Sequence, residues 1–198
     1  GLVVDGENSI NVVEATLKRL QEPDCDEERF RNNFATLTLG SGGVAMLLGR
    51  SDLCEEVHAF KGGVNLAASQ HNRLCLGQVD GMVTDTKKLL FAGIELANQC
   101  LNRAKQEMGW VLDDLDELIL HQVSKVHTEQ LAATLGLSMD KIFRLYPEFG
   151  NIGPASVPIV LSKVLEAGRI KSGDRIALMG IGSGLNCSMC EVNWGANT

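Results

Sequence analysis

Short apolar runs alternate along the chain with longer segments in which apolar residues recur every three or four positions. The short runs predict β-strands, and the longer segments predict helices with one buried face. The predicted strands cover residues 2–4, 34–39, 44–48, 57–68, 118–120, 142–145 and 175–179, with a last strand that ends at Trp194. The predicted helices cover residues 84–109, 124–135 and 155–167, with a helical turn at 16–20. Strands and helices in this order predict an α/β fold whose mixed sheet carries helices on both faces.

Glycine and polar residues separate these elements. Gly136 and Gly168 directly follow two of the predicted helices, a position where glycine often ends a helix. The stretches 22–28 and 69–82 are polar and predict loops. The glycine-rich turn 40–43 leads into a strand and not into a helix with a lysine. We therefore expect a close crossing of two backbones there rather than a phosphate-binding loop.

The composition is that of an ordinary folded protein with an acidic balance. The 198 residues are 44% hydrophobic and 22% charged, and the formal net charge is −7. This charge provides no basic field that would attract nucleic acid or an anionic membrane. No apolar run is long enough to span a bilayer. We expect no nucleic-acid partner, no membrane span and a cytoplasmic protein.

Six cysteines are scattered along the chain, and a protein of this size does not need disulfides. Cys187 and Cys190 have a C-x-x-C spacing, but they lie in a predicted strand, where residues three apart point to opposite faces. No second pair and no histidine ligand stands nearby. We expect reduced thiols and no metal site.

A histidine and an asparagine are the candidate catalytic residues. His121 follows the apolar run 118–120, at the carboxyl end of a strand, where ligands and catalytic groups gather in α/β folds. Asn151 lies between Gly150 and Gly153 in a tight turn, and its amide is a donor that does not titrate. The two side chains, directed at one carbonyl oxygen, would form an oxyanion hole. A surface histidine and a turn asparagine are the alternative interpretations.

The segment 180–184 reads Gly-Ile-Gly-Ser-Gly and is a third feature. A loop this rich in glycine allows the backbone N–H groups of Gly182, Ser183 and Gly184 to point into a cavity. His71 lies in the polar stretch 69–82, and we expect it to be solvated.

The order and spacing of these features resemble a known family. The matching motifs are His121-Gln122, Gly150-Asn151 followed by Ala155-Ser156-Val157-Pro158, then Gly168-Arg169-Ile170-Lys171-x-Gly173-Asp174, and the final glycine-rich loop. They resemble the C-terminal half of the β-ketoacyl synthase III branch of the thiolase superfamily, and residues 39–48 resemble the hairpin near the end of its first half. Residues 180–189 look like the enzymes that condense two long-chain acyl-CoAs head to head for olefin biosynthesis. The synthases that initiate fatty-acid synthesis usually read His-Gln-Ala-Asn where this chain has His121-Gln-Val-Ser124, which favours the head-to-head branch.

The resemblance implies a thiolase-like fold and a homodimer, with residues 1–52 ending the first half and 53–198 forming most of the second. It implies a Claisen condensation of acyl-CoA or acyl carrier protein thioesters, with no cofactor. A cysteine nucleophile would take an acyl group from one thioester, and His121 and Asn151 would stabilise the enolate of the other. The loop 182–184 would help to hold the oxyanion at the acyl-cysteine. None of the six cysteines matches the nucleophile's context, so the nucleophile is expected upstream of Gly1.

Three other interpretations stay open. The first is a fatty-acid-initiating β-ketoacyl synthase III, which would use acetyl-CoA and malonyl carrier protein and release CO₂. The second is a non-catalytic subunit that pairs with a chain supplying the cysteine. The third is a ligand-binding α/β module without catalysis.

Overall fold

A four-stranded mixed sheet forms the centre of the structure, a computed structural model that describes residues 1–78 and 81–195. The strand order is β3 (Ala59–Ala67), β8 (Asn186–Asn193), β7 (Arg175–Gly182) and β6 (Glu117–Leu120). β6 runs parallel to β7, whereas β8 is antiparallel to both of its neighbours. The mixed sheet predicted from the sequence is confirmed.

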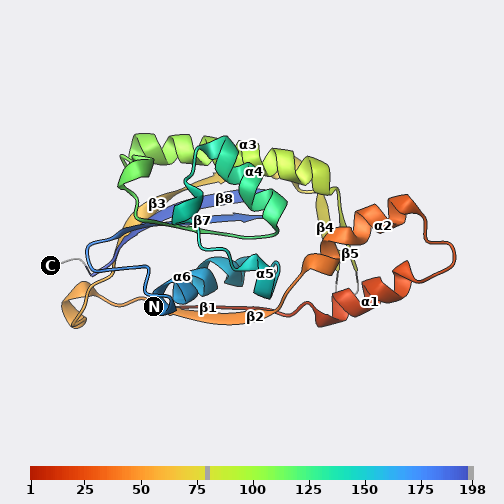
Figure 1. The fold of residues 1–198 in the computed structure, drawn as a ribbon, viewed down its shortest axis with the longest axis horizontal. Helices are drawn as coiled ribbons and strands as arrows, with labels where there is room; N and C mark the ends of the chain where they lie inside the picture. The colour runs from red at the N-terminus through yellow and green to blue at the C-terminus, as the bar shows by residue number, and fades with distance from the viewer. Residues whose placement is uncertain (79–80, 196–198) are drawn as a thin grey trace.

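Helices cover both faces of this sheet, as Figure 1 shows. α3 (Thr86–Glu107) and α4 (Lys125–Leu135) lie on one face, and α6 (Ser156–Glu166) lies on the other. Beyond α6 lies a separate antiparallel ribbon made of β1 (Leu2–Glu7) and β2 (Gly42–Leu47). The result is a layered α/β architecture in which α6 is covered by β-structure on both sides.

A smaller group of elements lies at one end of the molecule (Figure 1). It consists of α1 (Ile10–Leu20), α2 (Glu27–Asn33) and the hairpin of β4 (Cys75–Gln78) and β5 (Gly81–Thr84). Short helical turns complete the chain: η1 (Phe34–Thr38), η2 (Ser51–Leu53), η3 (Ser69–His71), η4 (Leu112–Asp114), η5 (Met139–Lys141), α5 (Tyr146–Phe149) and η6 (Gly153–Ala155). Within the described ranges, no helix is long and apolar enough to cross a membrane.

The core consists of two apolar clusters, one on each face of the sheet. Leu118 and Leu120 of β6 belong to the cluster beneath α3 and α4, whereas Ile119 between them belongs to the cluster beneath α6. Each of these side chains is at most 1% exposed, so each burial stabilises the fold by about 1.5–3 kcal/mol. β6 is therefore buried on both faces, which holds the following residue, His121, at a defined place on the sheet edge.

The three long predicted helices are confirmed, with ends shifted by one or two residues. Asp85 is the single residue between β5 and α3, and it caps α3 because its carboxylate accepts the backbone N–H of Lys88 at 3.0 Å. Gly136 adopts a left-handed conformation with φ of 69° and ends α4, as its position in the sequence predicts. The predicted turn at 16–20 is the last part of the longer helix α1.

Two predicted strands are wrong. Residues 34–38 form the helical turn η1. Asp26 starts α2 by accepting the N–H of Arg29 at 2.7 Å, and the helical backbone continues from α2 directly into η1. Residues 142–145 form no strand, since the N–H of Leu145 binds the Gln122 side chain at 2.7 Å instead of a neighbouring strand.

Two loop predictions also need correction. The polar stretch 69–82 contains β4 and the start of β5, which pair as a hairpin; its residues 79 and 80 lie outside the described residues. β7 continues to Gly182, so the glycine-rich segment 180–184 is a loop only in its last part. The division of the chain after residue 52 stays a prediction.

Candidate functional site

His121 is the first residue after β6, and the sheet holds its backbone. Its N–H donates to the carbonyl of Met179 in β7 at 2.8 Å, which continues the parallel pairing of the two strands by one residue. Protein atoms surround the ring and lower the pKa of His121 to about 4, mainly because burial disfavours the charged imidazolium. The nearby His127 lowers this pKa further, and a hydrogen bond with the backbone of Gly153 opposes both effects. His121 is therefore neutral near pH 7 and carries a single ring N–H donor.

Asn151 is held by its backbone on one side and by its own side chain on the other. Its N–H donates to the Thr38 carbonyl at 2.9 Å, and its carbonyl accepts the N–H of Gly40 at 2.8 Å. The side-chain Oδ1 accepts the N–H of Gly153 at 3.1 Å. Because this bond uses the oxygen, it directs the Nδ2 amide away from the turn, and in the described part of the chain Nδ2 has no hydrogen-bond partner. Asn151 thus presents a free donor.

The predicted close crossing of two backbones at the glycine turn is confirmed. A Cβ added to Gly40 would lie 1.8 Å from the Phe149 carbonyl oxygen, and one added to Gly150 would lie 2.7 Å from the Thr38 carbonyl oxygen. Gly150 also has φ of 66°, a left-handed conformation that side chains rarely adopt. Glycine at both positions allows the segment before β2 to touch the turn that carries Asn151.

His121 and Asn151 meet at Gly153. The backbone of Gly153 lies close enough to the His121 ring to raise its pKa, and the Gly153 N–H donates to Asn151 Oδ1 at 3.1 Å. Two residues thirty positions apart in the sequence therefore share one neighbour in space. The structure places both residues of the predicted pair beside Gly153, with a neutral ring at His121 and, in the described residues, an unpaired Nδ2 amide at Asn151.

Gly182, at the end of β7, and Ser183 and Gly184, in the turn that follows, lie at the same end of the sheet as His121, because β7 is parallel to β6 and extends past its end. Two backbone bonds between Ala68 and Leu185, of 2.8 and 3.2 Å, secure the far side of the turn. In the described residues, no hydrogen bond joins this loop to His121 or Asn151. Its assignment to an oxyanion site stays a prediction.

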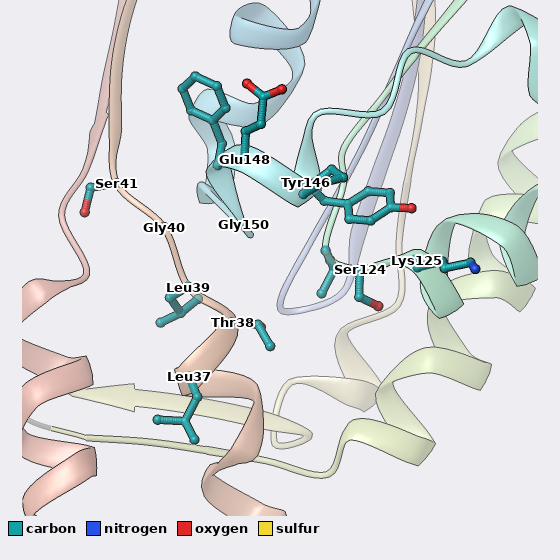
Figure 2. Close-up of a pocket in the computed structure, with 13 residues that line it drawn as sticks. Leu37, Thr38, Leu39, Gly40, Ser41, Ser124, Lys125, Tyr146, Glu148 and Gly150 are labelled. Atoms are coloured by element: carbon teal, nitrogen blue, oxygen red, sulfur yellow. The ribbon is translucent and has the colours of Figure 1, made fainter.

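A cavity of about 630 Å³ lies beside the segments that carry His121 and Asn151. Figure 2 shows residues 37–41 along one side and Ser124 and Tyr146 on the opposite side, with Gly150 between them. Its lining includes Val123 and Ser124, just after His121, and Gly150, just before Asn151. His121 and Asn151 are not among the lining residues, so the cavity runs along the segments that carry the pair and not between their side chains.

Sequence reasoning missed one residue of this region. Gln122 follows His121, is only 1% exposed, and joins three separate segments through hydrogen bonds. The sequence does contain a signal for Gln122. It is a polar residue placed close behind a strand with apolar residues on both faces, where a buried polar side chain must find hydrogen-bond partners.

The six cysteines are all free, and none is placed as a partner of His121 or Asn151 by a hydrogen bond. A hydrogen bond with Cys100, together with burial, raises the pKa of Cys187 far above its usual range. Burial also raises the pKa of Cys190. Cys187 is in the core while Cys190 is half-buried, and the described residues contain no group of three side chains that could hold a metal ion.

Comparison with known proteins shows which family part of the chain resembles. Residues 106–194 match the family described as 3-oxoacyl-[acyl-carrier-protein (ACP)] synthase III C terminal. The match includes His121 and Asn151, and the resemblance extends over nearly the whole chain.

Two curated relatives are both acyl-CoA:acyl-CoA alkyltransferases. The protein from Xanthomonas campestris is 53% identical over 193 residues, which cover 98% of this chain and 57% of the relative. The protein from Shewanella oneidensis is 32% identical over 206 residues, which cover 98% of this chain and 59% of the relative. A β-ketoacyl-[acyl-carrier-protein] synthase III from Oceanobacillus iheyensis is 31% identical over 157 residues, covering 79% of this chain and 49% of the relative.

Solved structures of Xanthomonas campestris OleA match the fold over 98% of this chain and 56–57% of theirs, at 53% identity and a TM-score of 0.95. They include a form bound to cerulenin and a form with bound lauric acid and lauroyl-CoA. The chain thus spans a little over half the length of these relatives. The thiolase-like fold implied by the sequence is confirmed.

Proposed function

We propose that this chain is part of a β-ketoacyl synthase III-like acyltransferase that joins two long-chain acyl-CoAs in a Claisen condensation without loss of CO₂. The observation that carries the proposal is the placement of the neutral His121 ring and the unpaired Nδ2 amide of Asn151 beside the same residue, Gly153. The 53% identity to an acyl-CoA:acyl-CoA alkyltransferase supports this substrate class.

The reaction has two steps in this proposal. A cysteine of the complete enzyme attacks the first acyl-CoA; a bond forms between its sulfur and the acyl carbon, and CoA leaves as the thiol. A base then removes an α-proton from the second acyl-CoA, and the resulting enolate carbon attacks the acyl-cysteine. A carbon–carbon bond forms, the carbon–sulfur bond to the enzyme breaks, and a 2-alkyl-3-oxoacyl-CoA results.

His121 and Asn151 act in the second step. Negative charge collects on the thioester oxygen as the α-proton leaves, and two fixed N–H donors stabilise this charge more than they stabilise the neutral ground state. A protonated His121 would also donate a hydrogen bond, but its charge is costly in a buried site. Neither donor needs a metal or an organic cofactor, so thioesters alone serve as reactants in this proposal.

Substitution of each donor tests the proposal. In the complete enzyme that contains this chain, His121→Ala and Asn151→Ala should each lower the condensation rate about 10²–10³-fold, the usual cost of one oxyanion donor. The first step, measured as a single equivalent of CoA released from lauroyl-CoA, should stay near the wild-type rate. Asn102→Ala on the exposed side of α3 is the matched control and should change neither step. Unchanged condensation in both donor variants would overturn the proposal.

The 31% identity to a β-ketoacyl-[acyl-carrier-protein] synthase III favours a second candidate, a synthase that uses malonyl carrier protein and releases CO₂. The same donors would stabilise the enolate that decarboxylation leaves. Lauroyl-CoA supplied alone separates the two candidates. A condensed product without CO₂ supports the head-to-head reaction, and turnover that requires malonyl carrier protein supports the second candidate.

We also propose a homodimer and a cytoplasmic location. The six free thiols support a reducing compartment, since cysteines in oxidising compartments usually pair.

A further inference from the structure

The Gln122 amide is hydrogen-bonded to the segment that leads into Asn151. Its Nε2 donates to the carbonyl of Phe143 at 2.5 Å. Its Oε1 accepts the N–H groups of Leu145 at 2.7 Å and Tyr146 at 3.1 Å. One side chain therefore takes the place of a neighbouring strand for residues 143–146.

The Gln122 backbone is bound on the other side of Asn151. Its N–H donates to the hydroxyl of Ser156 at 3.2 Å, and Ser156 is the first residue of α6. Ser156 is 2% exposed, so water does not substitute readily for this bond. Asn151 lies midway between the two attachments, five residues after Tyr146 and five before Ser156.

We propose that Gln122 is a positioning residue that sets the placement of the Asn151 amide relative to the His121 ring. It is the covalent neighbour of His121, and it binds both ends of the stretch 146–156, so a shift of either donor must strain a Gln122 hydrogen bond. This role rests on the proposed function, since a fixed placement matters when both donors bind one oxygen. Misplacement of a reacting group by about 1 Å can cost about 100-fold in rate.

The alternative is that Gln122 only stabilises the fold, and a matched control separates the two roles. Gln122→Met keeps the length of the side chain and removes its three hydrogen bonds. Trp110→Phe removes a comparably buried bond, from Trp110 Nε1 to Glu191 at 2.7 Å, in a part of the core that is not bonded to His121 or Asn151. Gln122→Met should lower kcat for condensation by about 10–100-fold with release of the first CoA within about twofold of wild type, whereas Trp110→Phe should lower Tm but not kcat.

Substitution of Ser156 is a milder second test that does not require the Gln122→Met variant to fold. Ser156→Ala removes only the acceptor of the Gln122 N–H and should lower kcat by about tenfold with little change in KM. Ser156→Thr keeps the hydroxyl and should restore most of the lost kcat. Equal kcat in Ala and Thr variants, or a kcat loss in Gln122→Met no larger than in Trp110→Phe, would overturn the positioning role.

An NMR measurement keeps this inference separate from the proposed function. The side-chain NH₂ signals of Asn151, assigned by their loss in Asn151→Ala, should shift in Gln122→Met and Ser156→Ala and stay in place in Trp110→Phe. If they shift but the wild-type enzyme condenses no thioesters, the positioning holds and the proposed function fails. If they stay in place while condensation is normal in the wild type, the positioning role fails alone.

Discussion

A partly buried histidine with a lowered pKa makes stability depend on pH in a way that can be tested at one residue. The pKa of His121 is about 4 in the folded protein, compared with an ordinary value of 6.5. When the pH falls below 6.5, the unfolded chain takes up a proton at this residue and the folded protein does not. Folding stability therefore decreases as the pH falls from 6.5 to 4. Above pH 6.5 His121 is neutral in both states, and its titration no longer changes the stability.

The size of the loss follows from the two pKa values. At about pH 5 the unfolded histidine is almost fully protonated and the folded one is mostly neutral, which lowers the free energy of unfolding by about 2 kcal/mol relative to pH 7.5. His121→Asn removes this titration while keeping a hydrogen-bond donor. His127, whose pKa is also lowered by burial, is present in both proteins, so the effect of its own burial cancels, and its repulsion of a charged His121 is part of the measured difference.

Urea unfolding at the two pH values measures this difference. The wild-type protein should lose about 2 kcal/mol more than His121→Asn on going from pH 7.5 to pH 5. The absolute stability of the variant does not matter, because only its pH dependence is compared. Equal losses in the two proteins would mean that the His121 ring is as well solvated in the folded state as in the unfolded state, and the reasoning about a neutral donor would fail.

Two further predictions concern the backbone crossing and the thiols. Gly40→Ala should destabilise the protein by about 2–4 kcal/mol in urea unfolding, because the new Cβ would overlap the Phe149 carbonyl and break the bonds between the segments. In the control Gly43→Ala the nearest atom to the new Cβ is 4.0 Å away, and the stability should change by no more than about 0.5 kcal/mol. Equal effects of the two substitutions would contradict the crossing. A thiol reagent such as 5,5′-dithiobis(2-nitrobenzoate) should modify the exposed Cys54 rapidly and the buried Cys187 only on unfolding. Modification of Cys187 at the rate of Cys54 would show that this part of the core opens readily.

The elements that could be predicted from the sequence are those whose partners do not need to be known. α3, α4 and α6 show their helical period, and Asp85 and Gly136 mark two of their ends by local chemistry alone. β6 is recognisable as an unbroken apolar run because both of its faces are buried.

The errors occurred where a distant partner decides the structure. The alternating pattern of residues 34–39 suits a strand, but helical structure continues from α2 through Thr38, and among the described residues Leu39 makes only an isolated bridge to Asn151. Residues 142–145 have the composition of a strand, but their backbone bonds go to the Gln122 side chain, twenty or more residues away. A hydrophobic pattern carries no information about such a partner.

The same distinction holds for the candidate site, where some features depend on local sequence and others on distant partners. His121 and Asn151 could be predicted because each occupies a recognisable place, the end of a buried strand and a glycine turn. Their shared contact at Gly153, and the attachments made by Gln122 and Ser156, depend on which segments meet in space. The donors were visible in the sequence, while the structure that orients them was not.

The crossing at Gly40 also bears on how the two predicted parts of the chain cooperate. His121 and Asn151 lie after residue 52, but the backbone of Asn151 is bound to Thr38 and Gly40, which lie before it. If the chain divides after residue 52 as predicted, the orientation of one donor depends on a contact between the two parts. The donor pair is then complete only when both parts are folded against each other, so a substitution on either side of the division can alter the site without touching a donor.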